Sequence, residues 1–331
     1  MNLLLRAASA AGFVFVIVCA ASADGPADYG AAACATASDG ACPNVDWDCG
    51  CGPKWTVDAG AIFLDRSTPE NRQIARSLGG TTTISAGGEF NFNWGAGPDI
   101  SIARRFDCGD SIEVRYFSAD NTAPTVDYPA GNFQLGSFSN FGATDLRGQD
   151  RTELENIEIN WLHPVNDRFT FIAGFRSIEL HDQLSYLVTF PGFNAAYSWD
   201  EQNHLYGGQV GGKFSFFDGN SPWLFDVTGK AGAYGTASEN AFDLRPNTGG
   251  SFPGGANAVD SSFVGELDFK LGYRLTEHIS VYGGYQLLWI DTVALASDQA
   301  ANATRDFAQN VISPNQDIFY HGAQCGVEFG W

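Results

Sequence analysis

The sequence carries little charge for its length, and lysine is almost missing. Charged residues make up 17% of the 331 residues, against about 25% in an ordinary soluble domain. Lysine occurs only at Lys54, Lys213, Lys230 and Lys270, and the formal net charge is −20. Such acidity argues against nucleic acid or an anionic membrane surface as a partner. It is compatible with attraction of cations.

A long apolar run is also missing beyond the first 23 residues. No later stretch approaches the roughly 18 apolar residues that a membrane-spanning helix needs. If the mature chain lies in a membrane, it must therefore do so as a closed β-barrel. Any other fold would leave backbone N–H and C=O groups unsatisfied in lipid.

Residues 1–23 have the pattern of a signal peptide. Arg6 precedes a short apolar run centred on 13–18, and the small residues of 21–23 precede Asp24. The small-x-small spacing is that of a signal-peptidase site. We expect cleavage after Ala23 and export of the mature chain.

A leader rich in Gly, Ala and Asp, 24–53, follows and shows no strand pattern. We expect it in the periplasm, where an oxidising environment permits disulfides. Local pairing of its cysteines is favoured, and a cross-linked tether to another envelope protein is the alternative. The spacing of Cys49 and Cys51 does not match the CxxC of zinc sites, so neither a metal nor another cofactor is expected. The four leader cysteines are Cys34, Cys42, Cys49 and Cys51.

The chain ends in an amphipathic strand whose last residue is a tryptophan. Because successive side chains of a strand point to opposite faces, alternate residues from Phe319 to Trp331 form a mostly apolar face, interrupted by His321. Such an ending is typical of a bacterial outer-membrane β-barrel; the alternative is an edge strand of a soluble sandwich. Phe329 and Trp331 form the predicted insertion signal, which would be read by the barrel-assembly machinery.

Ten amphipathic strands are predicted along residues 54–331, joined by connections of two alternating kinds. Short connections rich in Gly, Pro, Asn and Asp have turn chemistry. Strict alternation of short and long connections is the outer-membrane pattern of periplasmic turns and extracellular loops. The sequence thus predicts an all-β, antiparallel up-and-down barrel in outer-membrane lipid, with both termini in the periplasm. The expected strands are 54–66, 87–106, 111–119, 151–163, 168–181, 200–217, 222–237, 260–275, 279–291 and 316–331. The short connections are 106–110, 163–168, 217–222 and 276–278, and the long ones are 67–86, 120–150, 182–199, 238–259 and 292–315. An extra hairpin within 120–150 or 182–199 would raise the strand count to twelve.

Aromatic residues cluster where these strands would cross the lipid–water boundary, as aromatic belts do. Core packing is the alternative for any single ring. The predicted belt at the short-turn end contains Trp55, Trp161, Phe169, Trp223, Phe329 and Trp331. The belt at the long-loop end contains Phe63, Phe90, Trp289 and Phe319.

Inward positions carry charges of both signs, and these are the predicted pore-lining residues. Side chains fill a barrel of eight strands, whereas sixteen to eighteen strands leave an aqueous channel. Ten strands lie near the closed end, and buried charges of opposite sign tend to pair. Inward glycines such as Gly60 and Gly174 either leave room or permit tight strand curvature. The charged inward positions are Asp58, Asp99, Arg105, Glu113, Arg115, Glu158, Arg176, Lys230, Glu266, Asp268, Lys270 and Arg274.

Catalytic signals are weak, and no enzymatic activity is predicted. The adjacent His181 and Asp182, at the expected outer rim, form the one pair worth considering for a barrel protease or lipase. An acidic residue beside a histidine at a loop root is more often ordinary solvated surface.

Four segments carry short motifs in a fixed order: 55–66 (WTVDAGAIFLDR), 152–160 (TELENIEIN), 171–180 (FIAGFRSIEL) and 203–211 (NHLYGGQVG). Together they resemble planctomycete proteins of the beta barrel porin-7 family and the related Legionella-type pore-forming outer-membrane proteins. The resemblance covers 54–331 and implies an outer-membrane barrel with pore activity and no catalytic residues. A narrow pore for passive diffusion of ions or small solutes is expected. A closed structural or adhesive barrel that acts through its extracellular loops is the alternative, and the oligomeric state is left open.

Overall fold

The computed structural model describes residues 53–78, 82–106, 109–136, 138–217, 221–302, 312 and 314–331. The predicted signal peptide, the leader and its cysteines Cys34, Cys42, Cys49 and Cys51 lie outside these residues. Within the described ranges, no helix is both long and apolar enough to cross a membrane.

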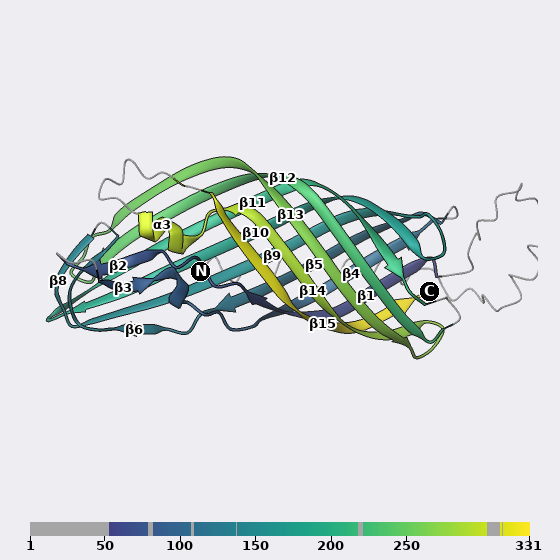
Figure 1. Cartoon of the computed structure of the whole chain (residues 1–331), viewed down its shortest axis with the longest axis horizontal. Helices are drawn as coiled ribbons and strands as arrows, with labels where there is room; N and C mark the ends of the chain where they lie inside the picture. The colour runs from purple at the N-terminus through teal and green to yellow at the C-terminus, as the bar shows by residue number, and fades with distance from the viewer. Residues whose placement is uncertain are drawn as a thin grey trace, which may run out of the picture. The chain divides into compact units, whose positions relative to one another are not determined.

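Ten antiparallel strands form a closed ring, because the pairing of β9 with β10 joins the two ends of one large sheet (Figure 1). The ring runs in chain order, and the predicted count of ten is confirmed. β6 (Val126–Tyr128) adds only a short stretch beside β9. The ring strands are β1 (Trp55–Arg66), β4 (Gly95–Arg105), β5 (Ser111–Thr122), β9 (Asp145–Pro164), β10 (Phe169–Phe190), β11 (Phe193–Ser215), β12 (Trp223–Pro246), β13 (Phe252–Arg274), β14 (Ile279–Val293) and β15 (Gln316–Gly330).

The wall has its apolar side chains outside and its charges inside. On β13, Phe263 and Leu271 are 41% and 49% exposed, whereas Glu266 and Asp268 between them are buried. This is the reverse of a soluble sheet, in which burial of apolar surface drives folding. The pattern is the one expected of strands that face lipid outward.

Where the structure describes the short connections, predicted turn residues shape them. Gly109 has a φ of 87°, a conformation that favours glycine. The Asn166 side chain accepts hydrogen bonds from the N–H groups of Arg168 and Phe169. Thr276 accepts bonds from His278 and Ile279 in the same way.

Two of the predicted long loops are instead arms of the ring strands. β10 and β11 remain paired up to Phe190 and Phe193, on either side of a turn at Pro191 and Gly192. β12 and β13 likewise remain paired through 238–259. The loop predictions at 182–199 and 238–259 were wrong because the arms extend beyond the lipid. Their outward face is mostly polar there, with exceptions such as Leu187 and Val259, so the apolar-out pattern that marks the membrane strands is lost.

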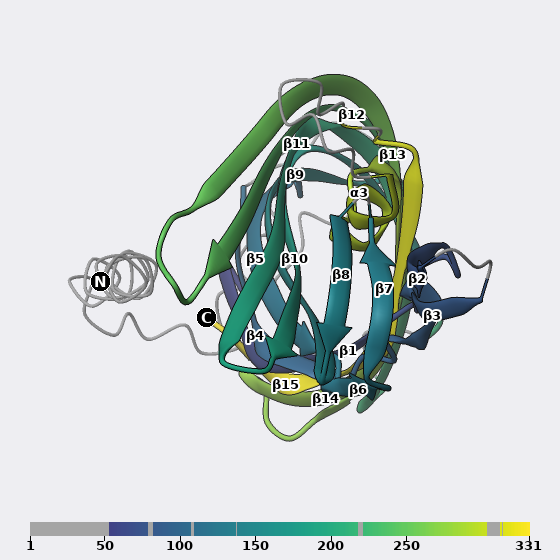
Figure 2. The same ribbon diagram turned by 90° about the vertical axis from the view of Figure 1, so that its left-hand side faces the viewer.

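A second sheet, in the order β3-β2-β7-β8, packs against these arms at the long-loop end. In Figure 2, β7 and β8 lie within the outline of the ring, and β2 and β3 lie at its side. Its strands come from 67–86 and 120–150, so the hairpin in 120–150 does not widen the ring. The apolar core between the layers includes Tyr186 and Trp199 from the arms. It also contains Phe90, which is fully buried, so Phe90 does not belong to an aromatic belt as predicted. The smaller elements are β2 (Gln73–Ser77), β3 (Thr83–Ala86), η2 (Gly87–Glu89), β7 (Gly131–Leu135), β8 (Phe138–Ala143) and α3 (Ala296–Asn302).

Candidate functional site: the barrel interior

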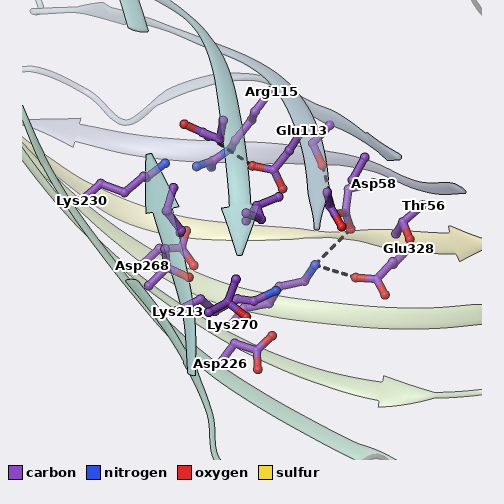
Figure 3. Close-up of a pocket in the computed structure, with 18 of the residues that line it drawn as sticks. Thr56, Asp58, Glu113, Arg115, Lys213, Asp226, Lys230, Asp268, Lys270 and Glu328 are labelled. Atoms are coloured by element: carbon purple, nitrogen blue, oxygen red, sulfur yellow. Dashed lines mark hydrogen bonds and ion pairs between the residues drawn. The ribbon is translucent and has the colours of Figure 1, made fainter. Parts of the chain in front are cut away.

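The barrel interior contains a polar cavity of about 370 Å³ at the short-turn end (Figure 3). Gly109 and Pro164, from two of the turns, line it, so the cavity extends to that end of the barrel. We call this space the vestibule. Its charged lining comprises Asp58, Asp99, Arg105, Glu113, Arg115, Lys213, Asp226, Lys230, Glu266, Asp268, Lys270 and Glu328.

The structure brings nine of the twelve predicted pore-lining residues to the vestibule. Glu158 and Arg176 lie deeper and are fully buried. The third predicted residue outside the vestibule lining is Arg274, near the turn end of β13. The nine are Asp58, Asp99, Arg105, Glu113, Arg115, Lys230, Glu266, Asp268 and Lys270.

Three charged lining residues were missing from the prediction: Lys213, Asp226 and Glu328. Each follows the same alternation that identified the others. Lys213 shares the inward face of β11 with Gln209, and Glu328 shares that of β15 with Gln324. Strand parity alone would have found them.

Near the turn end, Lys270 joins two carboxylates from strands on the same side of the ring. Its Nζ lies 3.0 Å from an Asp58 oxygen and 2.9 Å from a Glu328 oxygen. Figure 3 shows this ammonium between the two acids. The cation also lies 4.1 Å from the ring centre of Tyr282, within cation–π range.

Deeper in the lumen, five charged side chains from five strands form a connected layer, the ion-pair layer. Arg176 contacts Glu158 at 2.6 Å and also pairs with Glu266. Lys230 lies 2.8 Å from each of these carboxylates. Arg115 lies 3.2 Å from Glu266 and is bound bidentately by Asp99 on its other side. Because buried charges are costly unless they are paired, this layer fills the lumen with mutually neutralising groups.

The inward glycines do not widen the lumen. A Cβ on Gly60 would lie 2.4 Å from the carbonyl oxygen of Cys325. On Gly174 it would lie 2.3 Å from the Asn160 side chain. Both glycines therefore permit close approach to neighbouring strands, a role that was not predicted beside extra room and tight curvature.

Beyond the ion-pair layer, an apolar layer closes the lumen. Ring strands other than β4 contribute inward side chains to it, and β4 has Gly95 and Gly97 at this level. Ile62, Leu205 and Leu288 are each 0% exposed. A water-filled channel would leave such lining side chains accessible to water. The lumen is thus sealed at this level. The layer comprises Ile62, Leu64, Phe117, Ala119, Leu154, Ile178, Leu180, Leu205, Tyr234, Val264, Leu288, Ile290, Val293, Leu295, Ile318 and Tyr320.

A second buried charge cluster lies above the seal, beyond the lipid-facing band. Arg66 and Asp182, both fully buried, are 2.8 Å apart. The Arg66 guanidinium also lies 4.2 Å from the ring centre of Phe92. Burial, together with the nearby Asp182 carboxylate, raises the pKa of Asp150 well above its ordinary value, against the opposing effect of Arg66.

His181 and Asp182, the one pair considered for catalysis, point to opposite faces of β10. Asp182 points inward to Arg66, whereas His181 points outward and its Nε2 lies 2.9 Å from Asp200. The hydrogen bond to Asp200 raises the pKa of His181. The two residues therefore cannot act together on one substrate. In the ranges that the structure describes, no three His, Cys, Asp or Glu side chains are grouped to hold a metal ion.

The outer face defines the class of protein. Exposed aromatic side chains lie at both ends of an apolar band, among them Trp223 and Trp331 near the turns and Phe63 and Trp289 at the other end. Beyond the second end, outward positions become charged, as at Glu179. A closed antiparallel ring with an apolar band outside and charges inside is a membrane-spanning β-barrel.

The family follows from the sequence comparison. Residues 112–331 match the family described as "Putative beta barrel porin-7" (BBP7), and the chain belongs to this family of porin-like outer-membrane β-barrels. No curated protein is recognisably similar in sequence.

Solved structures of outer-membrane barrels resemble the chain in outline. The outer membrane protease OmpT of Escherichia coli is 12% identical with a TM-score of 0.46, covering 84% of this chain and 96% of its own. The translocator domain of the autotransporter NalP of Neisseria meningitidis is 12% identical with a TM-score of 0.40, covering 85% and 89%. The toluene transporter TodX of P. putida is 8% identical with a TM-score of 0.36, covering 84% and 90%.

Proposed function

We propose that this protein is a narrow pore for ions or small solutes in the outer membrane, and that the conformation described is its closed state. The observation that carries the proposal is the polar vestibule, which extends from the turn end to the ion-pair layer. Membership of a porin family supports it. A permanently open pore for passive diffusion does not fit, because the apolar layer excludes water.

The charges of the vestibule favour cations over anions as the solute. Its lining contains seven carboxylates, from Asp and Glu, and five cationic side chains, from Arg and Lys. Rings of acidic side chains are a common device of cation channels. The negative charge of the whole chain would act in the same direction.

Single-channel recording of the mature chain, residues 24–331, in a planar bilayer tests the pore. We expect rare, discrete current steps and a reversal potential that indicates cation preference. The pore is refuted if the folded barrel gives no current steps at any voltage, both in the wild type and in the two variants that are designed below to open it. Folding is checked independently by the resistance of the barrel to unfolding in cold detergent.

A closed adhesive barrel is the second candidate, favoured by the surface of the arms. Val259 on β13 is 84% exposed, and Phe141 and Phe252 are also exposed at this end. The upper part of β13 pairs with β12 only, since its pairing with β14 begins at Val264. Loss of cell attachment on removal of the β12–β13 arm, with the barrel intact, would support this function over the pore.

We propose no catalytic role, since His181 and Asp182 point in opposite directions. The proposed partners are outer-membrane lipid, which would surround the apolar band, and the barrel-assembly machinery, which would recognise Phe329 on β15 and Trp331 directly after it. The local disulfides of the leader remain a prediction.

A further inference from the structure

The chain turns into the lumen directly after β14 instead of running over the surface. Thr292 has a φ of 60°, and the pairing of β14 with β15 is interrupted between Ile290 and Val293. A left-handed conformation is a genuine outlier for a β-branched residue. From Val293 to Ala300 every residue is buried, whereas connecting segments ordinarily lie exposed on the surface. We call Val293–Ala300 the inserted segment.

Polar side chains of the wall hold the backbone of the inserted segment. Asn203 on β11 donates to the carbonyl oxygen of Ala294 at 2.8 Å and accepts from the N–H of Ala294 at the same distance. Asp182 on β10 accepts from the N–H of Ala296, also at 2.8 Å. The Asn203 amide thus satisfies both backbone groups of one buried residue, as a neighbouring strand would.

A third attachment fixes the far end of the segment. Asp298 in α3 lies 2.6 Å from Arg72, which precedes β2. In Figure 2, α3 appears within the outline of the ring. The segment is therefore attached to three separate parts of the barrel through a few polar contacts.

The seal of the lumen is partly made by this segment. Val293 and Leu295 belong to the apolar layer together with side chains of the wall. A wall side chain cannot leave the lumen unless its strand unfolds. The inserted segment can leave more readily, because β14 is paired with β13 and β15 up to Ile290 and beyond that point only Val293 is paired, with Gln316 of β15.

We propose that the inserted segment is the gate of the pore, released when the contacts of Asn203 and Asp182 break. This inference rests on the proposed pore function. Outward movement of the segment about Thr292 breaks the one pair between Val293 and Gln316. It removes Val293 and Leu295 from the seal and relieves the left-handed backbone at Thr292. The vestibule then connects to the extracellular side through the polar ion-pair layer.

The test compares Asn203→Ala with Gln202→Ala in the full mature chain. Gln202 precedes Asn203 on β11, but its side chain is exposed on the outer face, so its loss leaves the segment untouched. Single-channel recording measures the open fraction, and hydrogen exchange measures protection of the amides in 292–302. For Asn203→Ala we expect an open fraction on the order of 10- to 100-fold higher, from the loss of two buried hydrogen bonds. Exchange in 292–302 should be faster, with that of the ring strands unchanged.

A second variant acts on the seal instead of the attachment. Leu295→Ser weakens the apolar layer without altering the wall, and it should also raise the open fraction. It provides the test if Asn203→Ala does not fold.

Two failures are distinguishable. In the first, the wild type conducts while the amides of 292–302 stay protected from hydrogen exchange, and neither Asn203→Ala nor Leu295→Ser changes the open fraction. The inserted segment is then not the gate, and the proposed pore function stands. In the second, both variants fold and show faster hydrogen exchange of the amides in 292–302, but neither carries current. The proposed pore function is then refuted.

Discussion

Replacement of Arg176 by methionine should destabilise the barrel more than any other single change in the ion-pair layer. Arg176 is 1% exposed and contacts both Glu158 and Glu266. Methionine keeps much of the volume, so the loss is chiefly that of charge and hydrogen bonds. Two buried carboxylates then share Lys230, which lies 2.8 Å from each.

The size of the loss follows from the contacts that remain. Removal of one partner from a buried ion pair costs about 3–5 kcal/mol, because the other charge is left uncompensated. Lys230 still contacts both carboxylates, and Arg115 still lies 3.2 Å from Glu266. The expected cost therefore lies at the lower end of this range, about 3 kcal/mol. Urea titration of the barrel in lipid vesicles, followed by tryptophan fluorescence, measures the free energy of unfolding.

The double variant Arg176→Met, Glu266→Gln is the matched control. It removes one charge of each sign and leaves Glu158 with Lys230, so its stability should be close to that of the wild type, as is common when a buried pair is replaced as a whole. If the double variant is destabilised as much as Arg176→Met or more, packing rather than charge compensation holds this layer together. Charge compensation would then be refuted as the source of its stability.

Three further changes probe other parts of the chain. Asp200→Asn should return the raised pKa of His181 toward its ordinary value near about 6.5, measured by NMR titration. The stabilisation that Asp200 gives is full below that ordinary value and is lost as the pH rises through the folded pKa. The difference in stability between wild type and variant should therefore shrink as the pH rises above about 6.5. Thr292→Gly removes a β-branched residue from a left-handed backbone conformation and should stabilise the inward turn by up to about 1 kcal/mol. Hydrogen exchange of the amides in 292–302 should then be slower and the open fraction lower, and faster exchange would contradict this. Trp199→Ala should cost about 3–5 kcal/mol in the core of the arms. It should lower the unfolding temperature of the arms, while the membrane part of the ring keeps its resistance to detergent. Equal destabilisation of both parts would show that they unfold as one unit.

The membrane part of the fold could be predicted from the sequence because lipid imposes one rule on a whole face. On β13, Phe263 and Leu271 face lipid and their neighbours do not, so period-2 alternation is strong there. In the arms, Gln183 and Ser185 face water while Leu184 packs into a core, as in any soluble strand. In the arms the polar residues face outward, whereas in the membrane strands the apolar residues do. A search for strands with an apolar outer face therefore does not find the arms.

The interior could be predicted only as a set of inward residues. Strand parity places Arg115 and Glu266 inside, but it does not pair them, because they are 151 residues apart in the chain. Their contact depends on the curvature and stagger of the closed ring. The inserted segment escaped prediction for a related reason. Its apolar start, Val293 to Ala296, lies in a stretch predicted as loop, although an apolar run beyond the lipid is a signal that the run is buried.

The two layers that fill the lumen differ in what they can do to conduction. The ion-pair layer is polar, so water or a cation can take the place of a protein contact at Glu158 or Glu266 once the neighbouring space is hydrated. The apolar layer offers no such exchange, and a narrow apolar constriction stops ions by excluding water. The barrier therefore lies in the apolar layer, to which the inserted segment contributes Val293 and Leu295. A barrel that is stabilised by its ion pairs and closed by such a segment can open by releasing only the end of β14, where Val293 pairs with Gln316.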